Sequence, residues 1–289
     1  MSAPPSLARL VDLPPIETRQ TLTRRDTMLY ALGVGVGAVH PGSPDELKYV
    51  YERGLCALPT MAVVLAYPGF WMREPQYGID WRQVLHGEQA LELHRPLPVE
   101  GELVGLTKVE AVIDKGPDKG ALVITRRDIR LSNGTPLATV RQTSLLRGDG
   151  GRGGTTSVTP ALEPTPNRPP DLVRRTPTAL NQALLYRLSG DYNPLHVDPD
   201  VAREAGFPAP ILHGLATFGI VGRGLLAAAA AEEPSRVRTL SARFSSPVFP
   251  GDTLEVHLWR EADGLARFQA RALERDTLVL RNGLITFEV

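Results

Sequence analysis

A carboxylate and an imidazole stand five positions apart in a stretch with the composition of a tight turn. Asp191 and His196 flank the pair Asn193-Pro194. Because the residue before a proline disfavours the right-handed helical region, the chain is expected to turn here and to bring both side chains to one gap. Such a pair can hold a water through both of its ends and move its proton, which is the chemistry of hydration. The same residue types are ordinary turn formers, so a turn that only caps backbone groups is the alternative interpretation.

The pair His213-Gly214 is the second feature with chemical potential, because it opens a long apolar stretch after Pro208-Ala-Pro210. The first N–H groups of a helix have no partner inside the helix, and the positive end of its dipole lies there. A glycine lets a ligand carbonyl approach the backbone closely. The N–H of Gly214 is therefore a candidate donor to the oxygen of an enolate-like thioester. Close packing of helix against sheet is the alternative reason for a glycine at this point.

Two aspartates and two histidines in this region raise the question of a metal site. The spacings of Asp191, His196, Asp198 and His213 match no common zinc signature or facial triad. The sequence contains no phosphate-binding P-loop and no Gly-x-Ser-x-Gly elbow, so NTP hydrolysis and serine acyl transfer have no support. We expect the chain to use neither a metal nor a cofactor.

The elements that would position these residues can be read from capping signals and periodicity. Asp198 is expected to cap a short helix that has Pro199 at its first position and ends at Gly206. Two stretches, 59–66 and 213–222, are apolar on all sides and are expected to be buried helices. Alternating stretches are typical of antiparallel strands and occur at Glu102–Asp114, Ala121–Leu131, Thr135–Leu146, Thr239–Phe244, Thr253–Glu261, Arg267–Glu274 and Leu278–Val289.

The order of these signals repeats along the chain, which indicates an internal duplication. Tyr30 precedes His40 at the same spacing as Tyr186 precedes His196, and each half continues with a polar helical stretch, an apolar helix and several strands. Between the halves lies a segment rich in Gly, Pro, Ser and Thr that cannot be buried periodically. We predict an N-terminal unit at residues 1–147, a linker at 148–170 and a C-terminal unit at 171–289.

Composition restricts the partners and the compartment. Lys and Arg together number 32, as do Asp and Glu, so no net charge favours nucleic acid or an anionic membrane surface. Cys56 is the single cysteine, which excludes an intramolecular disulfide and fits a reducing compartment. The first residues lack the apolar core of a signal peptide, and Arg223 interrupts the most apolar run. We expect a soluble, cytoplasmic protein.

At the residues described first, the sequence resembles the MaoC-like, type-2 enoyl-CoA hydratase family. The signature of that family stands here as the run Ser189–His196, followed by His213-Gly214. The resemblance extends through Arg243–Gly251 and, in the first half, through His86-Gly87-Glu88-Gln89 and Asp114-Lys115-Gly116. Nearly the whole chain is covered, and the linker is the variable part.

The resemblance implies an α+β double hotdog, in which two antiparallel sheets, each wrapped around an apolar helix, pack side by side. Only the C-terminal unit would carry the hydratase pair, since the first half has Gly33-Val-Gly-Val-Gly37 where its own aspartate should stand. The vacated first half would leave room for an acyl chain. The resemblance implies catalytic roles for Asp191, His196, Asn193 and Gly214, and substrate binding by His86, Gly87, Lys115, Tyr192 and Phe244.

The function expected from this resemblance is R-specific, reversible syn hydration of trans-2-enoyl-CoA to (3R)-3-hydroxyacyl-CoA in fatty-acid or related acyl-CoA metabolism. The alternatives are dehydration of a (3R)-hydroxyacyl thioester on a carrier protein and a non-catalytic acyl-CoA-binding protein. Hotdog thioesterase action is disfavoured, because hydrolysis must attack the carbonyl itself. The partner is an acyl-CoA thioester, without nucleic acid or membrane, and the chain would be a monomer that forms a pseudo-dimer internally, or a homodimer.

Overall fold

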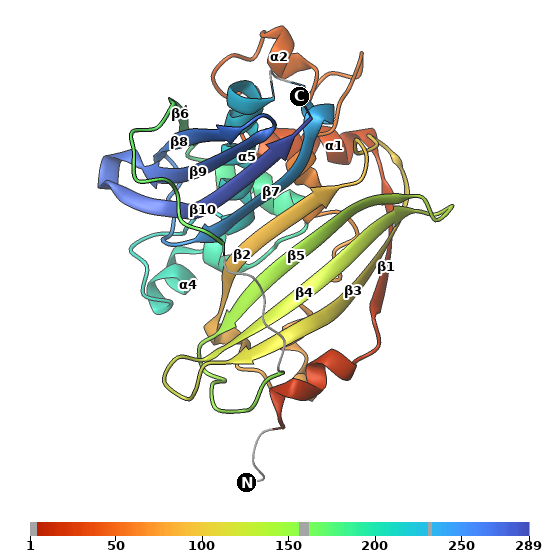
Figure 1. The fold of residues 1–289 in the computed structure, drawn as a ribbon, viewed down its shortest axis with the longest axis vertical. Helices are drawn as coiled ribbons and strands as arrows, with labels where there is room; N and C mark the ends of the chain where they lie inside the picture. Colours follow the sequence, from red (N-terminus) through yellow and green to blue (C-terminus); the bar gives the residue numbers. More distant parts are fainter. Residues whose placement is uncertain (1–4, 156–161, 231–232, 289) are drawn as a thin grey trace.

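A computed structural model describes residues 5–155, 162–230 and 233–288 of the chain, and its main feature is one large antiparallel sheet (Figure 1). The sheet lies in the spatial order β1-β3-β4-β5-β2-β7-β10-β9-β8-β6. Its strands among the described residues are β1 (Ile16–Leu22), β2 (Val84–Leu93), β3 (Gly101–Asp114), β4 (Ala121–Leu131), β5 (Pro136–Leu146), β6 (Leu172–Pro177), β7 (Val237–Phe244), β8 (Thr253–Ala262), β9 (Leu265–Ala272) and β10 (Thr277–Phe287). The strands expected from alternation all form, although Val289, the last residue of the final prediction, lies outside the described residues.

The second half of the sheet repeats the first. The order β1-β3-β4-β5-β2 becomes β6-β8-β9-β10-β7 when five is added to each number, so the two half-sheets share one topology. They meet where β2 pairs antiparallel with β7, with Gln89 opposite Ala242. The two sheets expected to pack side by side are therefore hydrogen-bonded into one continuous sheet, in which β2 and β7 satisfy each other's edges.

The helices are few and mostly short, and they lie on one side of the sheet or at its ends (Figure 1). The α-helices of the described residues are α1 (Arg24–Gly33), α2 (Pro44–Leu47), α3 (Gln182–Tyr186), α4 (Pro199–Glu204) and α5 (Gly214–Ala229). The 3-10 turns are η1 (Leu7–Asp12), η2 (Pro59–Val63), η3 (Trp71–Arg73), η4 (Pro75–Tyr77), η5 (Trp81–Gln83), η6 (Arg187–Ser189), η7 (Pro194–His196), η8 (Pro234–Arg236) and η9 (Leu273–Arg275). Within the described ranges no helix is long and apolar enough to cross a bilayer.

The two apolar stretches expected to be helices differ in outcome. The second forms α5, whose 16 residues pack against β6, β7 and β8. The first forms only the 3-10 turn η2, so the expectation of a full buried helix over residues 59–66 is wrong. The reason is local: Ala66 has φ of 44°, and Tyr67 precedes Pro68, a position that disfavours helical geometry.

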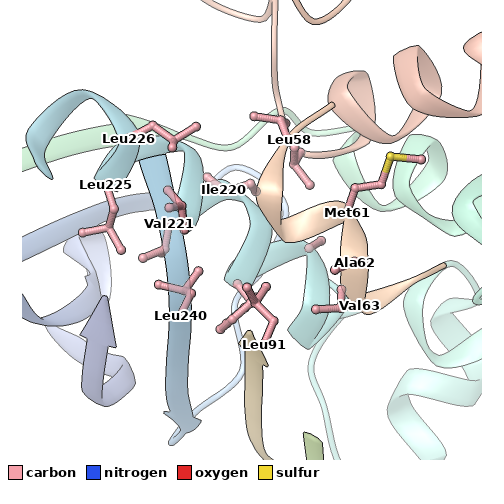
Figure 2. Packing of buried hydrophobic residues seen from close by; sticks show 14 of the residues in the cluster. Leu58, Met61, Ala62, Val63, Leu91, Ile220, Val221, Leu225, Leu226 and Leu240 are labelled. Carbon is pink, nitrogen blue, oxygen red and sulfur yellow. The ribbon is translucent and has the colours of Figure 1, made fainter. Parts of the chain in front are cut away.

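One hydrophobic core joins the two halves (Figure 2). Met61 and Ala62 of η2 lie close to Ile220 of α5, beside strand residues from both halves. A Cβ at Gly222 would come within 2.5 Å of a methyl group of Thr60, so α5 and η2 are in direct contact at this glycine. The labelled core residues come from both central strands as well, with Leu91 on β2 and Leu240 on β7. The short N-terminal turn thus takes the place of a helix in a core shared by both half-sheets.

The glycine-rich segment after β5 contains no helix or strand in its described part, while residues 156–161 of the predicted linker lie outside the described residues. Its beginning is packed against the β3–β4 turn. The carboxylate of Asp114 accepts hydrogen bonds from the N–H groups of Gly116, Gly151 and Gly153. A Cβ at Gly150 would lie 2.1 Å from the carbonyl oxygen of Gly116, so only glycine fits there. The glycines of the segment predicted to be a linker therefore also allow close packing of its backbone against the β3–β4 turn.

Candidate active site

The loop that follows α3 brings the hydration pair to one place. Gly190 has φ of 115°, which suits a glycine and turns the chain out of η6. The backbone of Asn193 then joins the pair: its N–H donates to Oδ1 of Asp191 at 3.2 Å, and its carbonyl oxygen accepts from the N–H of His196 at 3.3 Å. The Asn193 side chain caps the next turn by accepting from the N–H of Leu195. Asn193 thus joins the two residues through its backbone, and the catalytic role expected for it stays a prediction.

A short helix fixes the loop from behind. The side chain of Asp198 accepts from the N–H groups of Asp200 and Val201, and Pro199 occupies the first position of α4. Gly206 follows the helix with φ of 87°, which lets the chain leave it. The cap, the proline and the terminal glycine of this helix are thus confirmed.

The hydrogen bonding of His196 defines its tautomer. Its Nδ1 lies 2.8 Å from the carbonyl oxygen of Ile211, and because a carbonyl only accepts, Nδ1 must carry a proton. In the neutral ring the lone pair is therefore on Nε2. Burial of the ring lowers the pKa of His196 below its usual 6.5, despite smaller opposing effects of Ile211 and of the Asp191 charge. His196 is thus neutral near pH 7 and has a lone pair available as a base.

His213 belongs to the site more closely than the sequence interpretation assumed. Its ring stacks on that of His196, with centroids 3.7 Å apart and planes at 28°. Its Nε2 donates to the backbone carbonyl of Asp191 at 3.1 Å, which leaves Nδ1 buried and without a partner among the described residues. Burial, together with the neighbouring His196, lowers the pKa of His213 to about 4. Its position directly before Gly214 in the sequence was the signal that could have identified it.

These three side chains form one compact polar cluster. A carboxylate oxygen of Asp191, a ring nitrogen of His196 and a ring nitrogen of His213 all lie within 4.8 Å of one another. A single water oxygen about 2.8 Å from each of two such atoms would bridge them at an angle close to tetrahedral. The cluster offers three ligand atoms that could also hold a metal ion. The expectation that the site uses no metal therefore stays a prediction.

The opposite wall of the site comes from the start of α5 and from the other half of the molecule. Gly214 is the first residue of α5, and a Cβ there would lie 3.3 Å from the ring of Phe244 on β7. The Phe244 ring in turn lies 4.6 Å, between centroids, from the ring of His86 on β2. Gly87 sits at an irregularity of β2, between the residues paired with Ser144 and Thr143, and such bulges redirect side chains.

His86 is a half-buried, electrostatically sensitive member of this wall. Its Nε2 is buried without a hydrogen-bond partner. Desolvation lowers the pKa of His86 to about 4, against smaller raising effects from Gln89, Glu88 and the charge of Asp191. The carboxylate of the C-terminal loop thus acts electrostatically on a residue of the N-terminal half. The site lies where the two half-sheets join.

Two of the expected substrate-binding residues lie outside this cluster. Lys115 is exposed in the turn between β3 and β4, and none of the hydrogen bonds or ion pairs among the described residues joins it to the site. Tyr192 is 58% exposed, and the guanidinium of Arg187 lies 5.0 Å from the centre of its ring. The roles expected for both in binding substrate stay predictions.

Comparisons with protein families and named relatives show to which family the chain belongs. Residues 21–148 match the model of the MFE-2 hydratase 2 N-terminal domain, and residues 161–282 match that of the MaoC-like domain. A Mycobacterium tuberculosis protein named 3-hydroxyacyl-thioester dehydratase Y is 40% identical, and the match covers 92% of each chain. Enoyl-CoA hydratase 2 of Arabidopsis thaliana is 37% identical over 91% of this chain and 90% of the relative. The chain is 42% identical to peroxisomal multifunctional enzyme type 2 of Mus musculus but spans only 36% of that protein.

Solved structures confirm the architecture and complete the comparison. A MaoC-like dehydratase from Phytophthora capsici superposes with a TM-score of 0.86 at 35% identity, over 97% of this chain and 98% of that one. A Mycobacterium tuberculosis protein described as a double hotdog fold superposes with a TM-score of 0.58 at 18% identity, which supports the fold alone. The expected α+β double hotdog is thus confirmed, and the chain belongs to the MaoC-like family of type-2 enoyl-CoA hydratases and 3-hydroxyacyl-thioester dehydratases.

Proposed function

We propose that this chain is an R-specific enoyl-CoA hydratase that adds water reversibly to trans-2-enoyl-CoA and forms (3R)-3-hydroxyacyl-CoA. The observation that carries the proposal is the cluster in which Asp191, a neutral His196 and His213 lie within 4.8 Å of one another, beside the free N-terminus of α5. The names of the hydratase and dehydratase relatives support the same hydro-lyase chemistry.

The proposed mechanism assigns one task to each wall of the site. A water held between Asp191 and His196 gives a proton to Nε2 of His196 as its oxygen attacks C3 of the enoyl group. The electrons move to the thioester oxygen, and the N–H of Gly214 stabilises the resulting enolate. A proton then returns from the Asp191–His196 pair to C2 on the same face. Because one water-holding pair serves both steps, addition is syn.

His213 acts as a positioning residue in this scheme. Its hydrogen bond to the Asp191 carbonyl holds the loop, and its ring supports that of His196. A second protonated ring at 3.7 Å would repel a protonated His196, so a His213 whose pKa is about 4 leaves His196 free to take the proton.

The direction in which the acyl chain and the CoA moiety extend follows from the elements that form the walls of the site. Because His86 and Phe244 place the site at the joint of the half-sheets, we propose that the acyl chain extends into the N-terminal half. The CoA moiety would then leave toward the exposed side of the site, where Tyr192 and Lys115 are the proposed contacts. We propose a cytoplasmic enzyme that is a monomer or homodimer, on the basis of its single cysteine and of the pseudo-dimer within one chain.

The reverse reaction on a carrier-protein thioester is the second candidate, and it rests on the relative named as a thioester dehydratase. The test is the loss of ultraviolet absorbance of enoyl thioesters, with trans-2-enoyl groups of increasing length presented on CoA and on a carrier protein. Loss with CoA substrates, giving a product that an R-specific dehydrogenase oxidises, supports the proposal. Loss only with the carrier-bound series favours the second candidate, and no loss with either indicates a non-catalytic acyl-CoA-binding protein.

A further inference from the structure

The side chain of Arg187 lies at the rim of the site, between residues that belong to its walls. Tyr186, the residue before it, packs against His213 with ring centroids 5.0 Å apart. Tyr192 directly follows Asp191 in the catalytic loop, and the guanidinium of Arg187 lies 5.0 Å from the centre of its ring. Because the Tyr192 side chain is exposed, the guanidinium is held on the side where the site opens.

The positive charge of Arg187 has no anionic partner in the part of the chain that the structure describes. None of the ion pairs there includes it, and Asp191, four positions later, forms none with it. Its Nε is buried without a hydrogen-bond partner. The Tyr192 ring interacts with the face of the guanidinium, and such a contact leaves the N–H groups at the edge able to donate. An edge of this kind is the usual protein partner of carboxylates and phosphates.

The guanidinium is near the polar cluster without contacting it. Among the described residues, no hydrogen bond or ion pair joins Arg187 to the side chains of Asp191, His196 or His213. Burial is the largest of the causes that lower the pKa of His213 to about 4, and the charge of Arg187 is the smallest. An anion that Arg187 binds is therefore a part of the ligand away from the reacting carbons.

The proposed thioester substrate carries such an anion at one end only. Its acyl chain is proposed to extend into the N-terminal half, past His86 and Phe244, and a simple acyl chain has no charge. The pantetheine arm leaves toward the exposed side, where Tyr192 and Arg187 lie. Roughly 15 Å of extended arm separate the thioester sulfur from its 4′-phosphate, enough to reach from the cluster past the rim of the site.

We propose that Arg187 binds the 4′-phosphate of the pantetheine arm, with the Tyr192 ring holding the guanidinium in place. This inference rests on the hydratase function proposed above. The phosphate oxygens would accept charge-assisted hydrogen bonds from the edge of the guanidinium and neutralise its unpaired charge. The 4′-phosphate is the first phosphate of CoA and also links the arm to a carrier protein, so both thioesters present the same group to Arg187.

The test uses a series of thioesters that share one trans-2-enoyl group and differ in the arm. For the full-length protein, kcat/KM is measured for the enoyl thioesters of pantetheine, of 4′-phosphopantetheine, of CoA and of a carrier protein. Binding of the corresponding saturated thioesters is followed by calorimetry. The variants are Arg187→Met, Arg187→Lys and, as matched control, Arg203→Met, whose exposed side chain pairs with Asp200 on α4. Circular dichroism checks the fold of each variant.

We expect addition of the 4′-phosphate to raise kcat/KM of the wild type by about ten- to a hundredfold, chiefly through a lower KM. Arg187→Met should lose this gain and still hydrate the pantetheine thioester at the wild-type rate. Arg187→Lys should keep part of the gain because the charge remains, and Arg203→Met should keep all of it. Added salt should reduce the gain, which a merely structural role of Arg187 would not produce. If Arg187→Met does not fold, Arg187→Lys and the salt dependence decide.

Three results would overturn the inference. A wild type that gains nothing from the 4′-phosphate would exclude this contact, even if the rest of CoA adds affinity. A gain unchanged in Arg187→Met would remove Arg187 from the arm. An equal loss with all thioesters, pantetheine included, would mean that Arg187 only supports the catalytic loop. A loss with the CoA thioester, the carrier-bound thioester or both supports the inference and identifies the source of the phosphate. Absence of hydration, with binding of saturated thioesters that still depends on the 4′-phosphate and on Arg187, would instead refute the proposed function and leave this inference standing.

Discussion

Replacing Gly214 by alanine would test the thioester-oxygen site with a single methyl group. The added Cβ would lie 3.3, 3.5 and 3.7 Å from three carbons of the Phe244 ring. The closest of these distances is tighter than an ordinary van der Waals contact, so the ring must move by a few tenths of an ångström. That motion also disturbs His86, whose ring is 4.6 Å from that of Phe244. The methyl group itself occupies space next to the N–H that is proposed to hold the enolate oxygen.

The magnitude follows from the two effects of the substitution. Loss of one oxyanion donor typically costs a hundred- to a thousandfold in rate, and a donor that is obstructed rather than removed should cost less. We therefore expect kcat/KM to fall by roughly ten- to a hundredfold, or about 1.4 to 2.7 kcal/mol in activation free energy. Alanine favours the helical backbone over glycine, so the free energy of unfolding should change by no more than about 1 kcal/mol.

Gly224 provides a matched control within α5. A Cβ there would lie 3.8 Å from the Thr176 hydroxyl and 3.9 Å from a carbon of Arg174, which are ordinary contacts. Gly224→Ala should therefore stabilise the protein by roughly 0.5 to 1 kcal/mol and leave hydration unchanged. Enoyl-CoA absorbance and denaturant unfolding, measured on both variants, give the comparison. Activity of Gly214→Ala within twofold of the wild type would refute the oxyanion role, and an equal loss in both variants would assign the effect to the helix.

The remaining predictions concern the protons of the site. Asp191→Asn should lose roughly two to four orders of magnitude in turnover, while Asp200→Asn, on exposed α4, should stay near the wild type. Because burial lowers the pKa of His196, kcat/KM should persist as pH falls below 6.5, and an acid limb at or above 6.5 would contradict the neutral base. Folding lowers the pKa of His86 to about 4, so between pH 6.5 and 4 the unfolded chain binds a proton at this residue and the folded chain does not. The free energy of unfolding should therefore decrease as pH falls through this range, by roughly 3 kcal/mol from His86, as measured in denaturant titrations. Prolonged chelation should leave the hydration rate unchanged, and restoration of a lost rate by one metal would show that the histidine cluster holds it.

Local signals predicted the strands and the loop cap, because those features depend on neighbouring residues. The bounds of β4, Ala121–Leu131, follow from strict alternation, and the Asp198 cap follows from its hydrogen-bonding type and the proline after it. Strand β2 gave no such signal, since the bulge at Gly87 and the polar residues around it disrupt the alternation. Periodicity predicted β4 itself but gave no sign that Arg127 is buried on it, because inner faces are usually apolar.

Long-range contacts decided the features that the sequence could not predict. The 59–66 stretch is as apolar as a buried helix, yet it ends after one 3-10 turn because Ala66 must take a left-handed conformation. Its backbone there presses on β3, where a Cβ at Gly105 would lie 2.6 Å from the carbonyl oxygen of Ala66. The sequence placed His213 next to Gly214, but the stacking of its ring on that of His196 could not be predicted. Each of these contacts joins residues far apart or on different elements.

The loss of a site in the first half and the construction of one in the second are structurally linked. By the spacing of the duplication, Gly35 stands where the second half has Asp191, and it has φ of 83° with the Gln182 side-chain oxygen 3.5 Å from its potential Cβ. The amide of Gln182 donates to the carbonyl oxygen of Gly33 at 2.6 Å, and Gln182 begins α3, the helix that leads into the catalytic loop. A carboxylate at position 35 would therefore be strained and would disturb the support of Asp191 itself. Within this pseudo-dimer, the glycine loop of the first half therefore packs against the helix that leads into the catalytic loop of the second half.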